Sequence, residues 1–173
     1  MADMLQPDIA IVTGLAPNHL DQYKTLDAVA KDFKTTLQHV TSNCLYYNRD
    51  SESLDAYFSG DACPYDITGV EGISVKSYVV AIDTLEIIFS FGSQKTYKVE
   101  SLLIGAHQVG PLSVVLKIAL DMGLSIDEIT DGIKKMHPYE HRMQPRLLNG
   151  AWLIDDTYNG SIEGMRADRK SVV

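Results

Sequence analysis

Two short polar clusters follow apolar runs of the sequence, and both carry residue types that could do chemistry. The first is the stretch PNHLD, in which His19 lies two residues before Asp21. A neutral imidazole and a carboxylate at this spacing could bind a divalent cation or orient a proton transfer. The same stretch also fits a turn capped by Asn18 and Asp21 with an exposed histidine, so two interpretations stay open.

The second cluster, DDTYN, follows the apolar run AWLI and places Asp155 beside Asp156. Adjacent carboxylates at the end of a strand could hold a ribose hydroxyl or Mg²⁺, because α/β sheets usually build their sites in such loops. The alternative is a polar connection in which Asn159 caps a final helix that begins near Ser161.

Two further positions could bind an anion. Arg142 lies in the loop EHRM, and the guanidinium of an arginine is a suitable fork for phosphate oxygens, although surface arginines are common. His107 follows Gly105 and opens a helix. Free backbone N–H groups at such a place favour anions, but a histidine at a helix start also occurs without any ligand.

Several well-known site motifs are absent from the printed sequence. It contains no phosphate loop of the form G-x-x-x-x-G-K-[ST], no G-x-G-x-x-G, no G-x-S-x-G and no cysteine–histidine ladder with metal-ligand spacing. The two cysteines, Cys44 and Cys63, are too few for a disulfide framework. We expect them to be reduced thiols.

Composition narrows the class of protein. Of the 173 residues, 45% are hydrophobic and 22% charged, which is typical of a globular domain. Fifteen Lys and Arg against 23 Asp and Glu give a formal charge of −8, so we expect no nucleic-acid partner. No run reaches the roughly 18 apolar residues of a membrane span, and the N-terminus lacks a secretory-signal pattern. We therefore expect a cytoplasmic protein.

The elements that must position these residues begin with a strand–loop–helix–strand pattern. Residues 8–13 are an apolar, β-branched run that predicts a buried strand. Thr25 is suited to cap a helix, whose apolar residues recur along one face at Leu26, Val29, Ala30, Phe33, Leu37 and Val40. Residues 44–47 predict a second buried strand. This order is typical of a parallel α/β unit.

The remainder predicts antiparallel strands and then helices. The β-rich runs at 73–82, 85–91 and 96–99 indicate hairpins or a meander. An apolar helix ends at Gly123, and the sequence SIDE at 125–128 is a capping box for the next helix.

A last hairpin is predicted from residues 146–148 and 151–154, which turn at Asn149 and Gly150. The single tryptophan, Trp152, lies on its apolar strand and is expected in the core. The predicted fold class is α/β, a parallel sheet with helices plus an antiparallel strand-rich segment.

Taken in order, these motifs resemble the Mur ligase family. PDIAIVTGLAPNHLD, the helix with LDAVAKDF and the strand ending in YNRD look like part of its central domain. GAHQV, LSIDEITDGI and EHRMQPRLLNGAWLIDDTYNGSIEGMRA continue the same pattern. The resemblance covers residues 7–50 and 102–167 well and the strand-rich middle loosely. LIDDTYN is most similar to the branch that attaches a D-alanyl-D-alanine dipeptide to a UDP-muramoyl tripeptide.

The resemblance implies a partial central, ATP-binding domain at residues 1–148 and the beginning of a C-terminal Rossmann-like ligase domain at 149–173. The family uses ATP and Mg²⁺ to form an acyl phosphate, from which an amine displaces phosphate in peptidoglycan precursor synthesis. The implied substrates are a UDP-muramoyl peptide and an amino acid or dipeptide.

Position by position, the resemblance implies that His19 is associated with Mg²⁺, that Arg142 contacts the nucleotide and that Asp156 holds the ATP ribose. Tyr158 and Asn159 match a pair of residues near the nucleotide. His107 and Gln108 lie in the adenine-side element GAHQV, where Gln108 can offer an amide.

Two departures from the family pattern concern ligands. Pro111 occupies the position of an asparagine in the adenine-side element and cannot replace its side-chain amide. Phe33 occupies the position of a lysine whose carbamate binds a second Mg²⁺ in related ligases, while Lys31 aligns with the other lysine of that pattern.

The missing phosphate loop predicts that this chain alone does not catalyse ligation. We also expect an unpaired strand edge and uncovered apolar surface at residues 8–13 and 114–120, which would favour self-association. His19 and Asp156 are expected to share one magnesium–nucleotide cleft. The alternatives are a non-catalytic Mur-like nucleotide- or partner-binding module, and a superfamily ligase of the folylpolyglutamate or cyanophycin type.

Overall fold

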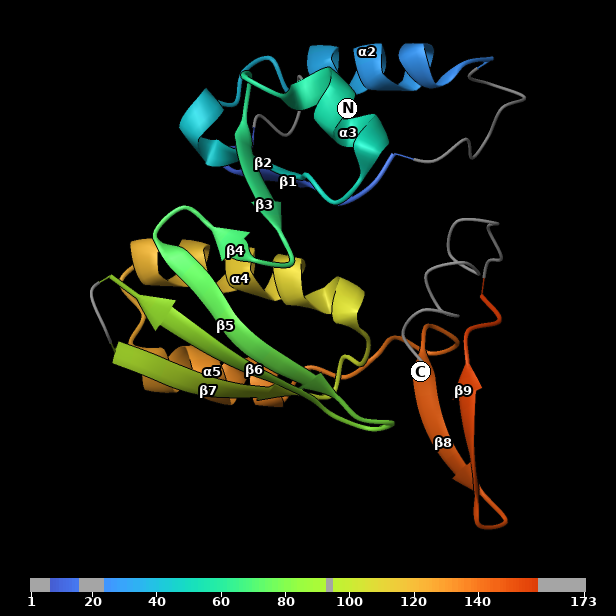
Figure 1. The fold of residues 1–173 in the computed structure, drawn as a ribbon. Coiled ribbons are helices and arrows are strands. Elements are labelled where there is room, and N and C mark those ends of the chain that lie inside the picture. The colour runs from blue at the N-terminus through green and yellow to red at the C-terminus, as the bar shows by residue number, and fades with distance from the viewer. Residues whose placement is uncertain (1–6, 16–23, 93–94, 159–173) are drawn as a thin grey trace. The chain divides into compact units, whose positions relative to one another are not determined.

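The computed structural model describes residues 7–15, 24–92 and 95–158. The chain divides into two compact units between Asp66 and Ile67, here called the N-terminal unit (Met1–Asp66) and the C-terminal unit (Ile67–Val173). Each unit is described by itself, with the element labels of Figure 1.

The N-terminal unit is a three-stranded parallel sheet with helices between its strands (Figure 1). The order is β1 (Ala10–Val12), α2 (Leu26–Thr36), η1 (Ser42–Cys44), β2 (Leu45–Asn48), α3 (Glu52–Phe58) and β3 (Cys63–Asp66). β2 pairs in parallel with both neighbours, with Ile11 opposite Tyr46 and Tyr47 opposite Pro64. This confirms the predicted parallel α/β unit, and adds a second crossover through α3 that the sequence pattern did not indicate.

Helix α2 begins and buries itself as its sequence predicts. The Thr25 side chain accepts a hydrogen bond from the backbone N–H of Ala28 at 3.2 Å, and Asp27 lies in the first turn. One apolar face of the helix packs on the strands. The core of this unit consists of Val12, Leu15, Val29, Ala30, Val40, Leu45, Tyr47, Leu54 and Phe58.

Strand β1 and the residue before it carry apolar side chains that this core does not cover. Ile9 and Ile11 are 39% and 40% exposed, whereas Val12 points into the core. Within the described ranges, β1 pairs with β2 alone. The predicted unpaired edge and uncovered apolar surface at residues 8–13 are therefore confirmed, while the expectation of a fully buried strand is only half right.

The C-terminal unit is built on an antiparallel sheet. β4 (Gly69–Val70), β5 (Ile73–Val80), β6 (Leu85–Phe91) and β7 (Lys95–Ser101) pair in sequence order. Leu85, Ile87 and Phe89 alternate along β6 and are fully buried, which is the period-two pattern of a sheet with one covered face. The predicted antiparallel middle segment is confirmed.

Two helices pack against this sheet (Figure 1). The short η2 (Ala106–Gln108) leads into α4 (Val109–Asp121), and α5 (Ile126–Lys134) follows. α4 ends where its sequence predicts, because Gly123 adopts a φ of 88° and its N–H donates to Leu120 at 2.9 Å. The capping box of α5 is also present. Val114 and Leu116 are fully buried, so the prediction of uncovered apolar surface on this helix is wrong.

The C-terminal hairpin joins β8 (Gln144–Leu148) and β9 (Ala151–Asp155). Asn149 and Gly150 at its turn have φ values of 52° and 82°, which are the left-handed conformations of a two-residue hairpin turn. The hairpin is confirmed, but the placement of Trp152 in the core is wrong. Its side chain is 47% exposed, because no described element covers this part of the strand.

Some expectations lie beyond what the structure describes. The predicted final helix near Ser161 falls outside the described residues. The expected domain boundary between residues 148 and 149 coincides with the start of the hairpin turn and stays a prediction. In the part of the chain that the structure covers, no helix has the length and apolar character needed to span a bilayer.

Candidate functional site

Two segments of the C-terminal unit meet and bring several of the predicted residues together. The loop at 139–143 lies against the segment at 155–158, which continues from β9. The backbone N–H of Tyr158 donates to the carbonyl of His141 at 3.1 Å. The N–H of Met143 donates to Oδ1 of Asp156 at 3.2 Å. These two hydrogen bonds join segments that are separated by the whole hairpin.

Arg142 lies over the aromatic ring of Tyr158, with its guanidinium carbon 4.3 Å from the ring centroid. A guanidinium at this distance is attracted by the π-electrons of the ring and keeps its N–H groups in the plane available for other partners. The ring of Tyr139 meets Tyr158 edge-on, at a centroid distance of 6.2 Å and an interplanar angle of 87°. Tyr139 is 73% exposed and Tyr158 54%, so this cluster faces solvent.

Asp156 combines partial burial with an available oxygen. One carboxylate oxygen accepts the Met143 N–H, and the other has no hydrogen-bond partner among the described residues. A carboxylate held in this way can accept hydrogen bonds from a pair of hydroxyl groups on a ligand. The arrangement therefore fits the role of holding a ribose.

Two opposing effects act on the pKa of His107. Burial of its imidazole lowers the pKa of His107, and the negative charge of Asp156 acts in the opposite direction. The ring lies against Gly105, where a Cβ atom would come 2.6 Å from its Cε1, and its Nε2 is 3.1 Å from the side-chain amide of Gln108. His107 thus presents a neutral ring near pH 7, within the electrostatic influence of Asp156.

Asp155, the neighbour of Asp156, makes a second set of contacts. Nδ1 of His141 is 2.9 Å from Oδ2 of Asp155, and a terminal nitrogen of Arg146 is 3.3 Å from the same oxygen. The other carboxylate oxygen accepts the hydroxyl of Thr157 at 2.8 Å. The hydrogen bonds from Thr157 and then from His141 lower the pKa of Asp155 below its usual range. Asp155 is therefore occupied by protein groups, unlike Asp156.

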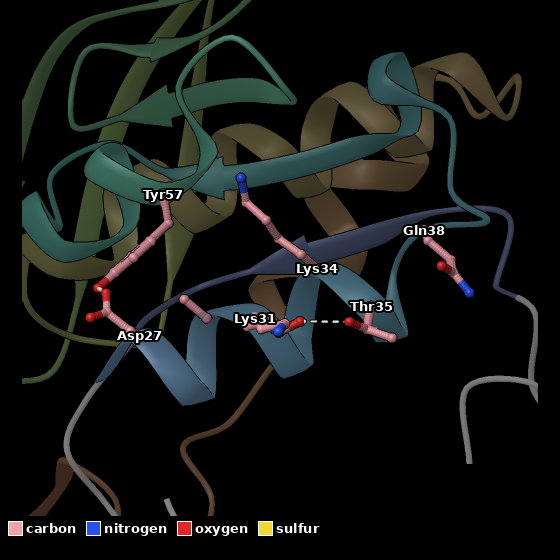
Figure 2. A pocket seen from close by; sticks show the side chains of 7 residues that line it. Asp27, Lys31, Lys34, Thr35, Gln38 and Tyr57 are labelled. Atoms are coloured by element: carbon pink, nitrogen blue, oxygen red, sulfur yellow. Dashed lines mark hydrogen bonds between the residues drawn. The ribbon is translucent and has the colours of Figure 1, made fainter. Parts of the chain in front are cut away.

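A separate hollow of about 390 Å³ lies on the N-terminal unit and is shown in Figure 2. It is lined by Asp27, Ala30, Lys31, Lys34, Thr35, Gln38 and Tyr57. Several of its polar groups already have protein partners: Tyr57 donates to Asp27 within the hollow, and Lys34 pairs at 2.8 Å with Asp61, which lies outside it. Phe33 packs against the core of this unit and leaves no ligand at the position of the second lysine. The hollow therefore offers a weaker site than the Arg142 cluster.

The ends of the parallel strands hold a tight polar arrangement of their own. The side-chain amide of Asn48 donates to the carbonyl of Thr13 at 3.3 Å. Nε of Arg49 donates to the buried carboxylate of Asp66 at 3.0 Å. These contacts fix the last residues of β1, β2 and β3 relative to one another, which is a structural role.

The predicted site residues fall into two groups. Arg142, Asp156 and Tyr158 lie in the two segments that meet. His107 interacts electrostatically with Asp156, and the side chain of Gln108 is within hydrogen-bond distance of His107. His19 and Asn159 lie outside the described residues, so their roles and the shared cleft stay predictions. Among the described residues, no three His, Cys, Asp or Glu side chains converge on a metal position. The Mg²⁺ prediction therefore depends on His19.

Sequence reasoning missed the supporting residues Tyr139, His141 and Thr157. The available signals were the adjacency of His141 to Arg142 and of Thr157 to the acid pair. Neither signal indicates a contact, because the loop backbone that brings them together has φ values of 63° at His141 and 44° at Met143, which a sequence does not reveal.

Comparison with known proteins gives one family match and several relatives. The family described as "Mur ligase middle domain" matches residues 1–118. The chain is 30% identical over 152 residues to UDP-N-acetylmuramoylalanine–D-glutamate ligase of Staphylococcus saprophyticus, covering 82% of this chain and 31% of that protein. It is 22% identical to UDP-N-acetylmuramoyl-tripeptide–D-alanyl-D-alanine ligase of Borreliella burgdorferi, covering 100% of this chain and 38% of that protein.

Solved structures show the same fold at lower identity. MurF from Acinetobacter baumannii aligns with a TM-score of 0.77 at 18% identity, over 99% of this chain and 38% of that one. MurF from Thermotoga maritima in complex with ADP aligns with a TM-score of 0.75 at 16% identity, over 99% and 41%. The chain thus spans between about three-tenths and two-fifths of the length of these proteins.

Proposed function

The chain belongs to the Mur ligase middle-domain family, and from this premise we propose that it forms part of an ATP-dependent amide-bond ligase of peptidoglycan precursor synthesis. In this proposal the reaction passes through an acyl phosphate, and the substrates are a UDP-muramoyl peptide and an amino acid or dipeptide. A cytoplasmic location belongs to the same proposal. The observation that carries it is the Arg142–Tyr158 stack beside the half-buried Asp156.

The residues of this chain would bind and orient the nucleotide rather than react with it. Asp156 would accept hydrogen bonds from the ribose hydroxyls through its available oxygen. Arg142 would present its guanidinium N–H groups to phosphate oxygens while its face remains on Tyr158. Asn159, next to Tyr158 in sequence, is proposed to lie at the same nucleotide.

His107 and Gln108 would line the same site from η2, the short helix that leads into α4. A neutral imidazole can exchange a hydrogen bond with the ligand without adding a competing positive charge. The amide of Gln108 offers both a donor and an acceptor to a base, although Pro111 removes one amide of the family pattern. His19 is proposed to hold Mg²⁺, which when bound would supply positive charge for the phosphoryl group.

The proposal is tested by adding ADP to the 173-residue chain and following backbone amide resonances by NMR. We expect weak, saturable shifts confined to residues 105–108 and 139–158. Arg142→Ala and Asp156→Asn should each reduce the affinity about tenfold, the usual scale for one charge-assisted contact of about 1.4 kcal/mol. Asp156→Asn retains the oxygen that accepts the Met143 N–H, so the local backbone is preserved.

A matched control separates site binding from general charge. Lys135→Ala removes one positive charge from the same unit at the end of α5 and should leave ADP affinity unchanged. If ADP shifts none of the described resonances, or if Lys135→Ala weakens binding as much as Arg142→Ala does, the nucleotide site is refuted. Of the two forms of the non-catalytic alternative, a partner-binding module would not respond to ADP at Asp156, whereas a nucleotide-binding module would.

A further inference from the structure

Asp155 and Asp156 are neighbours in sequence, but their carboxylates have different partners. Asp156 keeps an oxygen available for a ligand, whereas only 11% of the Asp155 side chain is exposed and both of its oxygens are engaged. Oδ2 is 2.9 Å from Nδ1 of His141, and Oδ1 accepts both the hydroxyl and the backbone N–H of Thr157, at 2.8 and 3.3 Å. Because an ionised carboxylate only accepts, His141 donates from Nδ1.

The hydrogen bond between His141 and Asp155 holds a loop in which two residues have an unfavourable backbone conformation. His141 and Met143, the two neighbours of Arg142, have φ values of 63° and 44°. Non-glycine residues adopt the left-handed region only where the surroundings impose it. The side chain of His141 is the one group of this loop that binds the Asp155 carboxylate directly, while backbone hydrogen bonds to Tyr158 and Asp156 complete the attachment.

We propose that His141 and Asp155 are positioning residues of the nucleotide site, whose hydrogen bond keeps the loop at 139–143 in the conformation that places Arg142 over Tyr158. This inference rests on the proposed function for its consequence, because the stacked guanidinium is the group assigned to the nucleotide. The stacking itself is a property of the free protein. It can therefore be tested without any ligand.

Other charged groups surround the pair and must be separated from it. Oε1 of Glu140 is 3.8 Å from Nε2 of His141, on the far side of the ring from Asp155. Arg146 lies 3.3 Å from Asp155 and 4.0 Å from Glu140. If charge alone mattered, Glu140 and Asp155 would be interchangeable. Only Asp155 accepts a short hydrogen bond from His141.

The test is His141→Gly, compared with Glu140→Gln as a matched control. Glycine adopts a positive φ without penalty, so the variant removes the imidazole without straining the loop. A guanidinium that rests on a tyrosine ring shows upfield-shifted side-chain proton resonances for its arginine, and NMR measures this shift in the ligand-free chain. We expect His141→Gly to abolish the shift at Arg142 and to weaken ADP binding about tenfold, and Glu140→Gln to change neither.

A second variant guards against a merely unfolded loop. Asp155→Asn keeps the shape of the side chain but removes its charge, and should reduce the Arg142 shift partially. The carboxyl pKa of Asp155, followed by carbon NMR, should rise towards its ordinary range in His141→Gly, because one of the hydrogen bonds that lower it is lost.

The outcomes distinguish this inference from the proposed function. If the Arg142 shift persists in His141→Gly, or if Glu140→Gln removes it equally, His141 and Asp155 are not positioning residues. If the shift disappears but Arg142→Ala leaves ADP affinity unchanged, the positioning stands and the nucleotide role of Arg142 fails.

Discussion

Arg142 derives its proposed role from the ring beneath it as much as from its charge. The guanidinium lies 4.3 Å from the centre of Tyr158, and this stacking orients its planar N–H groups before a ligand arrives. Lysine carries the same charge but has no planar group to stack. We therefore expect Arg142→Lys to weaken ADP binding by a factor of about three, less than Arg142→Ala does.

The measurement is an ADP titration of both variants by NMR under identical salt, since surface charges are screened. Tyr158→Phe is the companion variant, because it preserves the aromatic face and removes only the hydroxyl. It should retain the affinity. Equal affinity for the arginine and lysine forms would show that charge alone is responsible.

The close contact between Gly105 and His107 leads to a separate prediction. Its φ is 101°, and an added Cβ would lie 2.6 Å from Cε1 and 2.7 Å from Nδ1 of His107. Gly105→Ala should therefore destabilise the chain by about 1–3 kcal/mol and displace the His107 ring. Urea unfolding and the His107 resonances measure both effects.

Gly132 provides the contrast for that prediction. It lies within α5, and nothing approaches the position of its Cβ within 4 Å. Alanine is the better helix former there, so Gly132→Ala should stabilise the chain by about 0.5–1 kcal/mol. A destabilising Gly132→Ala would show that the unfolding signal does not report on backbone conformation as assumed.

For individual residues, the sequence indicated which residues belong to the site but not which partners they contact. The acid Asp156 and the loop arginine Arg142 were identifiable, because carboxylates after strands and arginines on loops are typical of such sites. Their separate partners were not, since the engagement of Asp155 and the availability of Asp156 depend on backbone angles at His141 and Met143. Residue type does not determine these angles.

At the scale of elements, helix α5 shows how a short sequence signal controls a helix. The Ser125 hydroxyl accepts from the N–H of Glu128, and the Glu128 carboxylate accepts from the N–H and hydroxyl of Ser125 at 2.8 and 2.6 Å. We expect Ser125→Ala to cost about 1 kcal/mol in the free energy of unfolding. Urea denaturation at neutral pH measures this loss.

The same capping box predicts a dependence on pH. Hydrogen bonds from the side chain and then the backbone of Ser125 lower the pKa of Glu128. A carboxyl group with a lowered folded pKa stabilises the fold above its unfolded pKa of about 4.3, and this contribution is lost as the pH falls through the folded value. The difference between wild type and Ser125→Ala should therefore shrink on acidification below about pH 4. A difference that grows would contradict the cap.

Elements with strong local signals were predictable, and those stabilised by distant contacts were not. Gly123, the box at Ser125 and the turn at Asn149 each lie where the sequence placed them. Helix α3 was missed because its seven residues bury only Leu54 and Phe58, which is too little for a periodic pattern. Trp152 was misplaced because an apolar residue on a strand does not reveal whether anything covers that strand.

At the scale of the whole molecule, the fraction of its relatives' length that the chain covers leads to a prediction about ATP turnover. It covers 31% of one curated relative and 38% of another, and its sequence has no phosphate loop. Phosphoryl transfer depends almost entirely on positioning and charge stabilisation around the terminal phosphates. The chain alone should therefore release no phosphate from ATP above the buffer rate, even with Mg²⁺ and a carboxylate substrate present.

A phosphate-release assay tests this, with ADP binding measured on the same sample to show that the preparation is folded. The two readouts belong to different parts of the site. Binding without turnover supports the proposed division between nucleotide orientation by these residues and phosphate activation elsewhere. Sustained Mg²⁺-dependent phosphate release by the purified chain would overturn it.

Self-association is the remaining property of the whole molecule, and the hairpin β8–β9 is where we expect it to arise. Leu148 and Leu153 lie on one face of the hairpin and are 61% and 51% exposed. Burying an exposed leucine contributes about 1.5–3 kcal/mol, so two of them can change an association constant by more than a factor of ten. We expect the chain to associate in a concentration-dependent manner, measured by sedimentation velocity.

The double variant Leu148→Thr and Leu153→Thr should weaken this association at least tenfold, since threonine keeps the strand conformation while removing apolar surface. Val79→Thr is the matched control, because Val79 is 60% exposed on β5 and the same type of change there should have no effect. Trp152, the single tryptophan, lies on the same hairpin and is 47% exposed. Trp152 pairs with Leu147 and therefore lies on the opposite face from Leu148 and Leu153, so its emission should not shift on this association. A monomer at all concentrations, or equal weakening by Val79→Thr, would exclude the hairpin as the contact.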